Sequence, residues 1–301
     1  MSRNPILTDK AFEEAAGGGV ASAGGPNPAQ EWQNARNMPG QATAAAPSAD
    51  AALSRSGRFA PAEASMHRMT MGGVAAATFI MFAVLLAAAF GGGQTVTVTP
   101  AGFDEAGQQA FTATFDAPFL MFGAVIVALV LAFVTAFKPQ LARFTSLGYA
   151  ACQGFVLGAI SAYYGALWQG IVAQAVLATF GVFLVMLVLY GLRILRATPR
   201  FVKGVIAATF GIMFMYLGIF VLNLFGVAEG FWTSGSPLGI IVSLVVVCVA
   251  ALNLSLAFDF IERGTEMGLP RYMDWYAGFG LMVTLIWLYL EMLRLLARLR
   301  Q

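Results

Sequence analysis

The stretch FLMFGAVIVALVLAFVTAF, residues 119–137, contains no charged residue. An α-helix rises about 1.5 Å per residue, so roughly 20 residues cross the hydrocarbon core of a bilayer. Six further stretches have a similar length and an apolar composition: 71–90, 146–166, 171–192, 204–226, 237–260 and 275–297. We therefore predict an all-α fold, a polytopic membrane helix bundle of seven transmembrane helices.

The composition supports a membrane protein and excludes several other classes. The chain is 59% hydrophobic and 11% charged, whereas about a quarter of the residues of a soluble domain are charged. A net charge of +2, with the basic residues scattered between apolar stretches, gives no nucleic-acid surface. Cys152 and Cys248 lie inside apolar stretches without a Cys/His cluster, so we expect neither a disulfide framework nor a zinc site. Without a nucleotide-binding loop, or a His or Cys beside an acid, we expect neither an enzyme nor a resident cofactor.

The chain divides into a tail and a membrane domain. Residues 1–65 are rich in Ala, Gly, Pro and Ser without a periodic apolar pattern, so we predict a disordered cytoplasmic tail followed by a membrane domain over 66–301. Two glycine patterns, Gly154 with Gly158 and Gly204 with Gly211 and Gly218, predict close helix packing.

The basic residues predict an orientation. Lys and Arg precede the first apolar stretch and follow the second, fourth and sixth, whereas the connections 91–118, 166–170 and 227–236 have none. By the positive-inside rule we expect a cytoplasmic N-terminus. We expect the protein to lie in the plasma membrane. The last stretch ends with Arg294, Arg298 and Arg300, so it either crosses against this rule or re-enters without crossing.

Two acids lie within the apolar stretches: Asp259 in LNLSLAFDFIERG (252–264) and Glu291 in LIWLYLEMLRLLARLR (285–300). Two deep, unpaired charges would cost about 5–7 kcal/mol, and such residues usually mark an ion or proton path. Two carboxylates that face one site share a proton or bind a hard cation such as Ca²⁺. We therefore predict a pH-sensitive cation site with Asp259 and Glu291 as ligands, to which Ser255 adds an oxygen.

Two alternatives to this shared site remain open. Arg294 and Arg298 share a helix face with Glu291, so a local ion pair is equally consistent with the sequence. Glu291 also lies about 24 Å along its helix from Trp275, whereas Asp259 lies near the cytoplasmic end of the preceding helix. In a simple hairpin the two acids would not meet, but a re-entrant last segment, or helices that continue into the cytoplasm, would bring them together.

Several motifs resemble those of one family. GFVLGAISAYY (154–164), FDF (258–260), LYLEMLRLL (288–296) and NPILT near the start, together with the seven-stretch layout, are similar to the Bax inhibitor-1 superfamily, in its bacterial branch with a disordered amino-terminal tail. The resemblance covers about residues 66–301 and implies a bundle around a central last helix.

The resemblance also implies a function, a pH-sensitive calcium leak. In such members two aspartates of the last two helices pair, and a basic residue at the cytoplasmic end of the second helix latches the closed state. By position, Asp259 corresponds to the first aspartate, Glu291 replaces the second and Lys138 is the latch. Apart from the resemblance, we expect Arg294 and Arg298, on the same helix face as Glu291, to act in gating.

The leading hypothesis is thus a passive leak for cations, chiefly Ca²⁺, which is gated by protonation of Asp259 and Glu291. The alternative is a regulatory stress-response membrane protein that binds a membrane partner such as a protease through the tail 1–65. Under both hypotheses the partners are the lipid bilayer and either ions or a membrane protein, and no nucleic acid.

Overall fold

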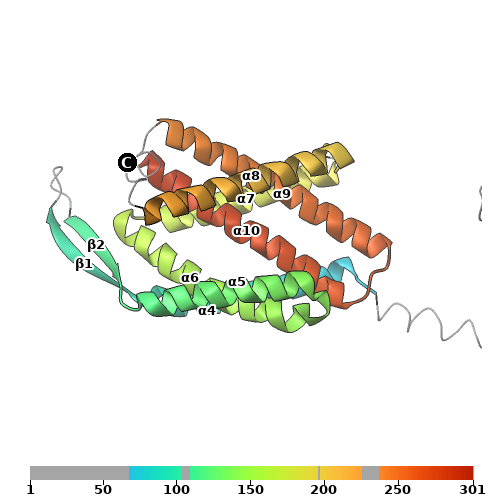
Figure 1. Cartoon of the computed structure of the whole chain (residues 1–301), viewed down its shortest axis with the longest axis horizontal. Helices are drawn as coiled ribbons and strands as arrows, with labels where there is room; N and C mark the ends of the chain where they lie inside the picture. The colour runs from blue at the N-terminus through green and yellow to red at the C-terminus, as the bar shows by residue number, and fades with distance from the viewer. Residues whose placement is uncertain (1–67, 104–108, 196, 226–236, 301) are drawn as a thin grey trace, which may run out of the picture. The chain divides into compact units, whose positions relative to one another are not determined.

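The computed structural model describes residues 68–103, 109–195, 197–225 and 237–300, and the predicted tail lies outside these residues. Within them, seven helices are long and apolar enough to cross a membrane, as predicted. In chain order they are α4 (Met71–Gly93), α5 (Pro118–Phe137), α6 (Ala142–Leu167), α7 (Ile171–Gly191), α8 (Pro199–Leu224), α9 (Pro237–Glu266) and α10 (Tyr272–Leu299), with a 3₁₀ turn η1 (Pro139–Leu141) before α6 (Figure 1).

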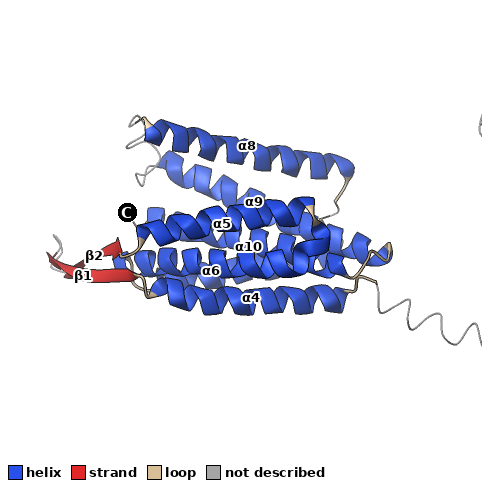
Figure 2. Cartoon of the chain, turned by 60° about the horizontal axis from the view of Figure 1, so that its bottom comes forward, coloured by secondary structure: helices blue, strands red, loops and turns tan. Residues whose placement is uncertain are grey.

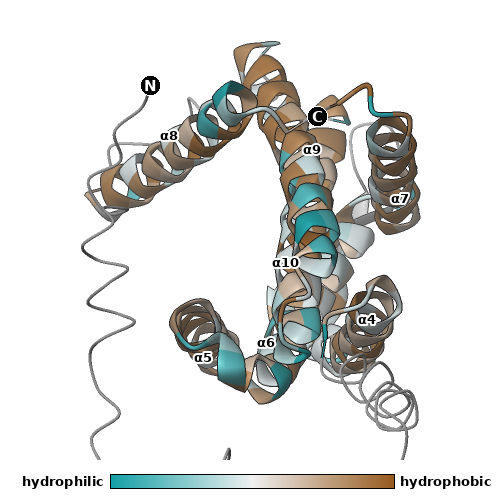
Figure 3. Ribbon diagram, turned by 90° about the vertical axis from the view of Figure 1, so that its right-hand side faces the viewer, coloured by the Kyte–Doolittle hydropathy of each residue, from teal (hydrophilic) through white to brown (hydrophobic). Residues whose placement is uncertain are grey.

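The last helix, α10, is central to the bundle, and this prediction is confirmed. It contacts α4, α6, α7 and α9, and it contributes residues to both hydrophobic clusters of the core. Half of its most apolar segment is buried within the chain, against 6% for α8. The peripheral helices α5, α7 and α8 consist mainly of apolar residues (Figure 3), as is required of helices that face lipid.

Small residues let α4 and α6 approach closely. A Cβ added to Gly154 would lie 2.3 Å from the carbonyl oxygen of Leu85, and one added to Gly158 would lie 1.9 Å from that of Ala89. Only glycine fits at such contacts, so the predicted packing role of this pair is confirmed. By contrast, Gly204, Gly211 and Gly218 of α8 do not pack: nothing in the described chain lies within 4 Å of an added Cβ.

A β-hairpin follows α4, and the sequence analysis did not predict it. Strands β1 (Val96–Phe103) and β2 (Gln109–Phe115) pair antiparallel, from Val96 opposite Phe115 to Phe103 opposite Gln109. The alternation of Thr with apolar residues in TVTVT and FTATF is the pattern of a two-faced strand. Phe115 stacks on Tyr163 of α6, with ring centroids 5.4 Å apart. The hairpin therefore lies against the end of α6 and extends beyond the helices (Figure 2).

Helices α9 and α10 form an antiparallel pair that begins at a tight turn. Gly268 adopts φ +62° in this turn, and the amide of Met69, just before α4, donates to the carbonyl of Leu269 at 2.6 Å. From here α10 runs without interruption for 28 residues, about 42 Å. The last segment is thus one continuous helix, long enough to span a bilayer.

Candidate functional site

Glu291 lies on the inner face of α10, at 1% exposure, inside a set of three donors. Arg294 Nη1 donates to both carboxylate oxygens, at 2.8 Å and 3.0 Å. The hydroxyl of Tyr216, from α8, donates at 2.8 Å, and the indole nitrogen of Trp287 donates at 3.3 Å. Trp287 and Arg294 lie four residues before and three residues after Glu291, so the helical repeat places all three on one side of α10.

Arg294 and Tyr216 also bind each other. Arg294 Nη1 donates to the Tyr216 hydroxyl at 2.5 Å, and its guanidinium carbon lies 5.0 Å from the centre of the Tyr216 ring. A carboxylate buried in a bundle is stable only if it is paired and hydrogen-bonded. Glu291 meets both conditions, because the local ion pair with Arg294 that the sequence allowed is present. It neutralises Glu291 in this structure.

Asp259 lies near the end of α9 and has a different partner. Its carboxylate forms an ion pair with Arg263, one turn later, at 2.9 Å, and its side chain is 21% exposed. Arg263 also donates to the carbonyl of Ala197 at 3.3 Å. Ser255, one turn before Asp259, is buried, and no described residue hydrogen-bonds its hydroxyl. Because solvent reaches the Asp259 pair, it contributes only about 0.3–0.5 kcal/mol.

The structure does not bring Asp259 and Glu291 together. The Phe260 and Tyr276 rings lie 5.9 Å apart, and Arg298 Nη1 donates to the carbonyl of Gly239 at 2.7 Å. These contacts fix the antiparallel register, in which Asp259 and Glu291 are separated by about 20 Å along the helices.

The predicted shared site is therefore not formed here, because α9 and α10 are joined by a short turn and pack as a simple hairpin. Across the described ranges, no group of three or more His, Cys, Asp or Glu side chains is placed to hold a metal ion. Whether Asp259 or Glu291 binds an ion on its own stays a prediction.

The predicted basic gating residues have different surroundings. Lys138 follows α5 and is exposed, and its ammonium has no ion-pair partner in the part of the chain that the structure describes. Arg294 holds Glu291, whereas Arg298 binds the carbonyl of Gly239 and the hydroxyl of Ser243 on α9. The predicted latch at Lys138 is thus not engaged, and the two acids of the apolar stretches pair with arginines instead: Glu291 with Arg294 and Asp259 with Arg263.

Three residues that contact the candidate site, or are buried acids like Glu291, were not predicted from the sequence. Trp287 stands one turn before Glu291, a spacing that could have indicated it, but Tyr216 comes from another helix and carried no such signal. Asp274, at the start of α10, is a further buried acid, and it accepts the backbone amide of Thr70 at 3.0 Å. Asp274 immediately precedes the predicted last stretch, 275–297, so it was not counted among the acids within the apolar stretches.

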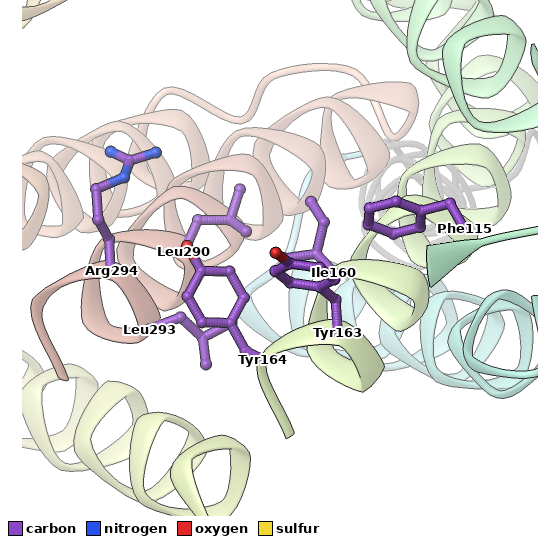
Figure 4. Close-up of a pocket in the computed structure, with 7 residues that line it drawn as sticks. All are labelled: Phe115, Ile160, Tyr163, Tyr164, Leu290, Leu293 and Arg294. Atoms are coloured by element: carbon purple, nitrogen blue, oxygen red, sulfur yellow. The ribbon is translucent and has the colours of Figure 1, made fainter. Parts of the chain in front are cut away.

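A cavity of about 320 Å³ adjoins the Glu291 group, between α6, β2 and α10. Its wall consists of Phe115, Ile160, Tyr163, Tyr164, Leu290, Leu293 and Arg294 (Figure 4). Figure 4 shows the aromatic rings along one side and Arg294 at one end. The cavity therefore lies beside the ion pair, at the end of the bundle that carries the hairpin.

Comparison with known proteins agrees with these features. The model of the Bax inhibitor 1 like family matches residues 4–301, which is almost the whole chain. No curated protein and no solved structure matches the chain. The family match, the seven apolar helices and the central last helix lead to one conclusion: the chain is a multi-pass membrane protein that belongs to the Bax inhibitor 1 like family.

Proposed function

We propose that this protein is a passive, pH-sensitive leak for cations, with Ca²⁺ as the principal ion, and that Glu291 is the carboxylate on which the ion and protons act. The observation that supports the proposal is the buried Glu291 on the central helix, neutralised by Arg294. A cation gains access to this carboxylate only when Arg294 leaves it. The pair therefore represents a closed state, and Arg294 is the gating residue.

Protons act on the same carboxylate. Protonation of Glu291 removes the charge that holds Arg294 and also the charge that attracts a cation. Both effects make flux depend on pH, and both require an ionisable side chain at position 291. The glutamine variant, which keeps the shape but cannot ionise, therefore loses this pH dependence.

Asp259 is proposed as a second, separate step on the path. It lies close to the turn between α9 and α10, with its side chain partly exposed beside Arg263. Lys138, Arg143, Arg263 and Arg271 lie at this same end of the bundle, so the positive-inside rule assigns it to the cytoplasm. Asp259 would then receive or release ions at the cytoplasmic mouth. The membrane proposed is the plasma membrane.

The test is Ca²⁺ flux into liposomes that hold the purified full chain. Glu291→Gln should lower flux about tenfold, the effect of losing roughly 1.4 kcal/mol of ion stabilisation, and Asp259→Asn should lower it less. The two effects should add in the double variant, because sites more than about 7–10 Å apart act independently. Asp116→Asn, an exposed acid that follows β2 at the base of the hairpin and accepts a hydrogen bond from Thr97, is the matched control and should conduct like wild type.

Equal flux in all five proteins would contradict the leak mechanism. It would favour the alternative of a regulatory protein that binds a membrane partner. A double variant with far less than additive loss would instead contradict the separation of the two carboxylates and restore the shared site.

A further inference from the structure

We infer that the cavity beside Arg294 binds a small organic anion with an apolar body, such as an aryl or short-chain carboxylate. The cavity lies between the last two turns of α6, the end of β2 and the last third of α10. Its volume, about 320 Å³, is at the lower end of the range of about 300–1,000 Å³ that ligand pockets span.

The charge of the wall selects an anion. Arg294 is the one formally charged residue among those that line the cavity, and none of the described lining residues is a carboxylate. Arg298 follows about one turn later on the same helix, so two arginines and one glutamate occupy the last turns of α10. This surplus of positive charge attracts anions to the site.

Arg294 has the donors for a carboxylate. Its hydrogen bonds to Glu291 and Tyr216 all come from Nη1. Nε and Nη2 bond to no residue that the structure describes, and the side chain is 36% exposed. Nε and Nη2 form the planar fork that binds both oxygens of a carboxylate or phosphate.

The rest of the wall fits an apolar body. Phe115 and Tyr163 stack in parallel, and Tyr164 meets Tyr163 edge to face, with centroids 5.9 Å apart. Leu290 and Leu293 complete the opposite side. Aromatic rings gain about 0.5–1.5 kcal/mol beyond burial when they pair in such geometries. An anion with an aromatic or aliphatic body can therefore use both the fork and the rings.

Binding would regulate the proposed leak. An anion on Nε and Nη2 competes electrostatically with Glu291 for the same guanidinium, so it loosens the pair that represents the closed state. Flux should rise when the cavity is filled. This consequence rests on the proposed function, but the binding itself does not.

The test is titration calorimetry with phenylacetate, on the full chain in nanodiscs of zwitterionic lipid. Wild type should bind phenylacetate, and neutral phenylethanol should bind at least about tenfold more weakly, because it lacks the charge that Arg294 pairs. Glu291→Gln should bind several-fold more tightly, since Arg294 then has no competing carboxylate. The double variant Glu291→Gln with Arg294→Gln leaves no unpaired charge, and it should bind phenylacetate at least about tenfold more weakly than wild type.

Arg300→Gln is the matched control, because Arg300 lies two turns further on and bonds Gln169 and Gln174 outside the cavity. It should bind like wild type. Equal affinity for phenylethanol and phenylacetate, or wild-type affinity in the double variant, would overturn the site. So would an Arg300→Gln variant that loses as much affinity as the double variant.

A second arm identifies the source of the anion. This arm uses nanodiscs that contain an anionic phospholipid. Weaker apparent binding of phenylacetate there shows that the lipid phosphate binds the same Nε and Nη2 donors of Arg294. Unchanged binding shows that the site prefers a soluble carboxylate. Both results support the site. If phenylacetate binds as predicted but does not change Ca²⁺ flux, the proposed leak mechanism fails and the anion site stands.

Discussion

Replacement of Arg294 by methionine should destabilise the protein more than replacement of Glu291 by glutamine. The two side chains form one pair, but their surroundings differ: the Glu291 side chain is 2% exposed, and that of Arg294 is 36% exposed. Arg294→Met keeps most of the side-chain volume and leaves a carboxylate buried without its counter-charge. Breaking a buried pair in this way costs about 3–5 kcal/mol.

The reverse change should cost less. In Glu291→Gln, the amide still accepts the hydrogen bonds of Tyr216 and Trp287, and Arg294 can extend its charged group toward water. We expect a loss of about 1.5–3 kcal/mol, the value of one hydrogen bond to a charged group. The double variant, Glu291→Gln with Arg294→Met, removes both charges and should be more stable than Arg294→Met alone.

The assay is equilibrium unfolding in detergent, with SDS as the denaturant and helical circular dichroism as the signal. Arg300→Met, which removes an exposed guanidinium that bonds Gln169 and Gln174, is the control and should change the free energy of unfolding by less than about 0.5 kcal/mol. Equal losses for Arg294→Met and Glu291→Gln, or a double variant whose loss is the sum of the two, would refute the reasoning.

Three further predictions concern packing around the site. Gly158→Val should prevent α4 and α6 from docking, because its Cβ would lie 1.9 Å from a backbone oxygen, whereas Gly211→Ala in open space should be neutral; SDS unfolding midpoints compare the two. Tyr216→Phe removes one hydroxyl from the Glu291 group and should cost about 1–3 kcal/mol in the same assay, and wild-type stability there would contradict the bonding described. Phe115→Ala removes the stack on Tyr163, so limited proteolysis should cut the hairpin several-fold faster than in wild type; an unchanged rate would show that other contacts hold it.

The helices were predictable because their signal is local. A run such as 119–137 has to be a helix in lipid, since only a helix satisfies its own backbone hydrogen bonds there. The close contact at Gly154 and Gly158 was predictable for the same reason, because small residues four apart present one flat face. The hairpin was missed because the connection 91–118 was read only for its charges, although TVTVT and FTATF alternate as strands do.

The site was only partly predictable, because it depends on contacts between helices. The spacing of Glu291 and Arg294 indicated their ion pair, and the structure has it. The position of Tyr216 depends on how α8 packs, which no local pattern encodes. Whether Asp259 meets Glu291 depends on the register of α9 and α10. Helix counting alone left open a simple hairpin, a re-entrant last segment and helices that continue into the cytoplasm.

The most direct test of the Glu291 mechanism compares Glu291→Gln and Arg294→Gln in the same Ca²⁺ flux assay, in liposomes of one lipid composition and at two pH values. Arg294→Gln keeps an amide donor but removes the charge that competes with a cation, so flux should rise several-fold above wild type. Glu291→Gln should lower flux about tenfold and abolish its dependence on pH. Changes in the same direction for both variants, or a Glu291→Gln protein that keeps the wild-type flux and pH dependence, would contradict the mechanism.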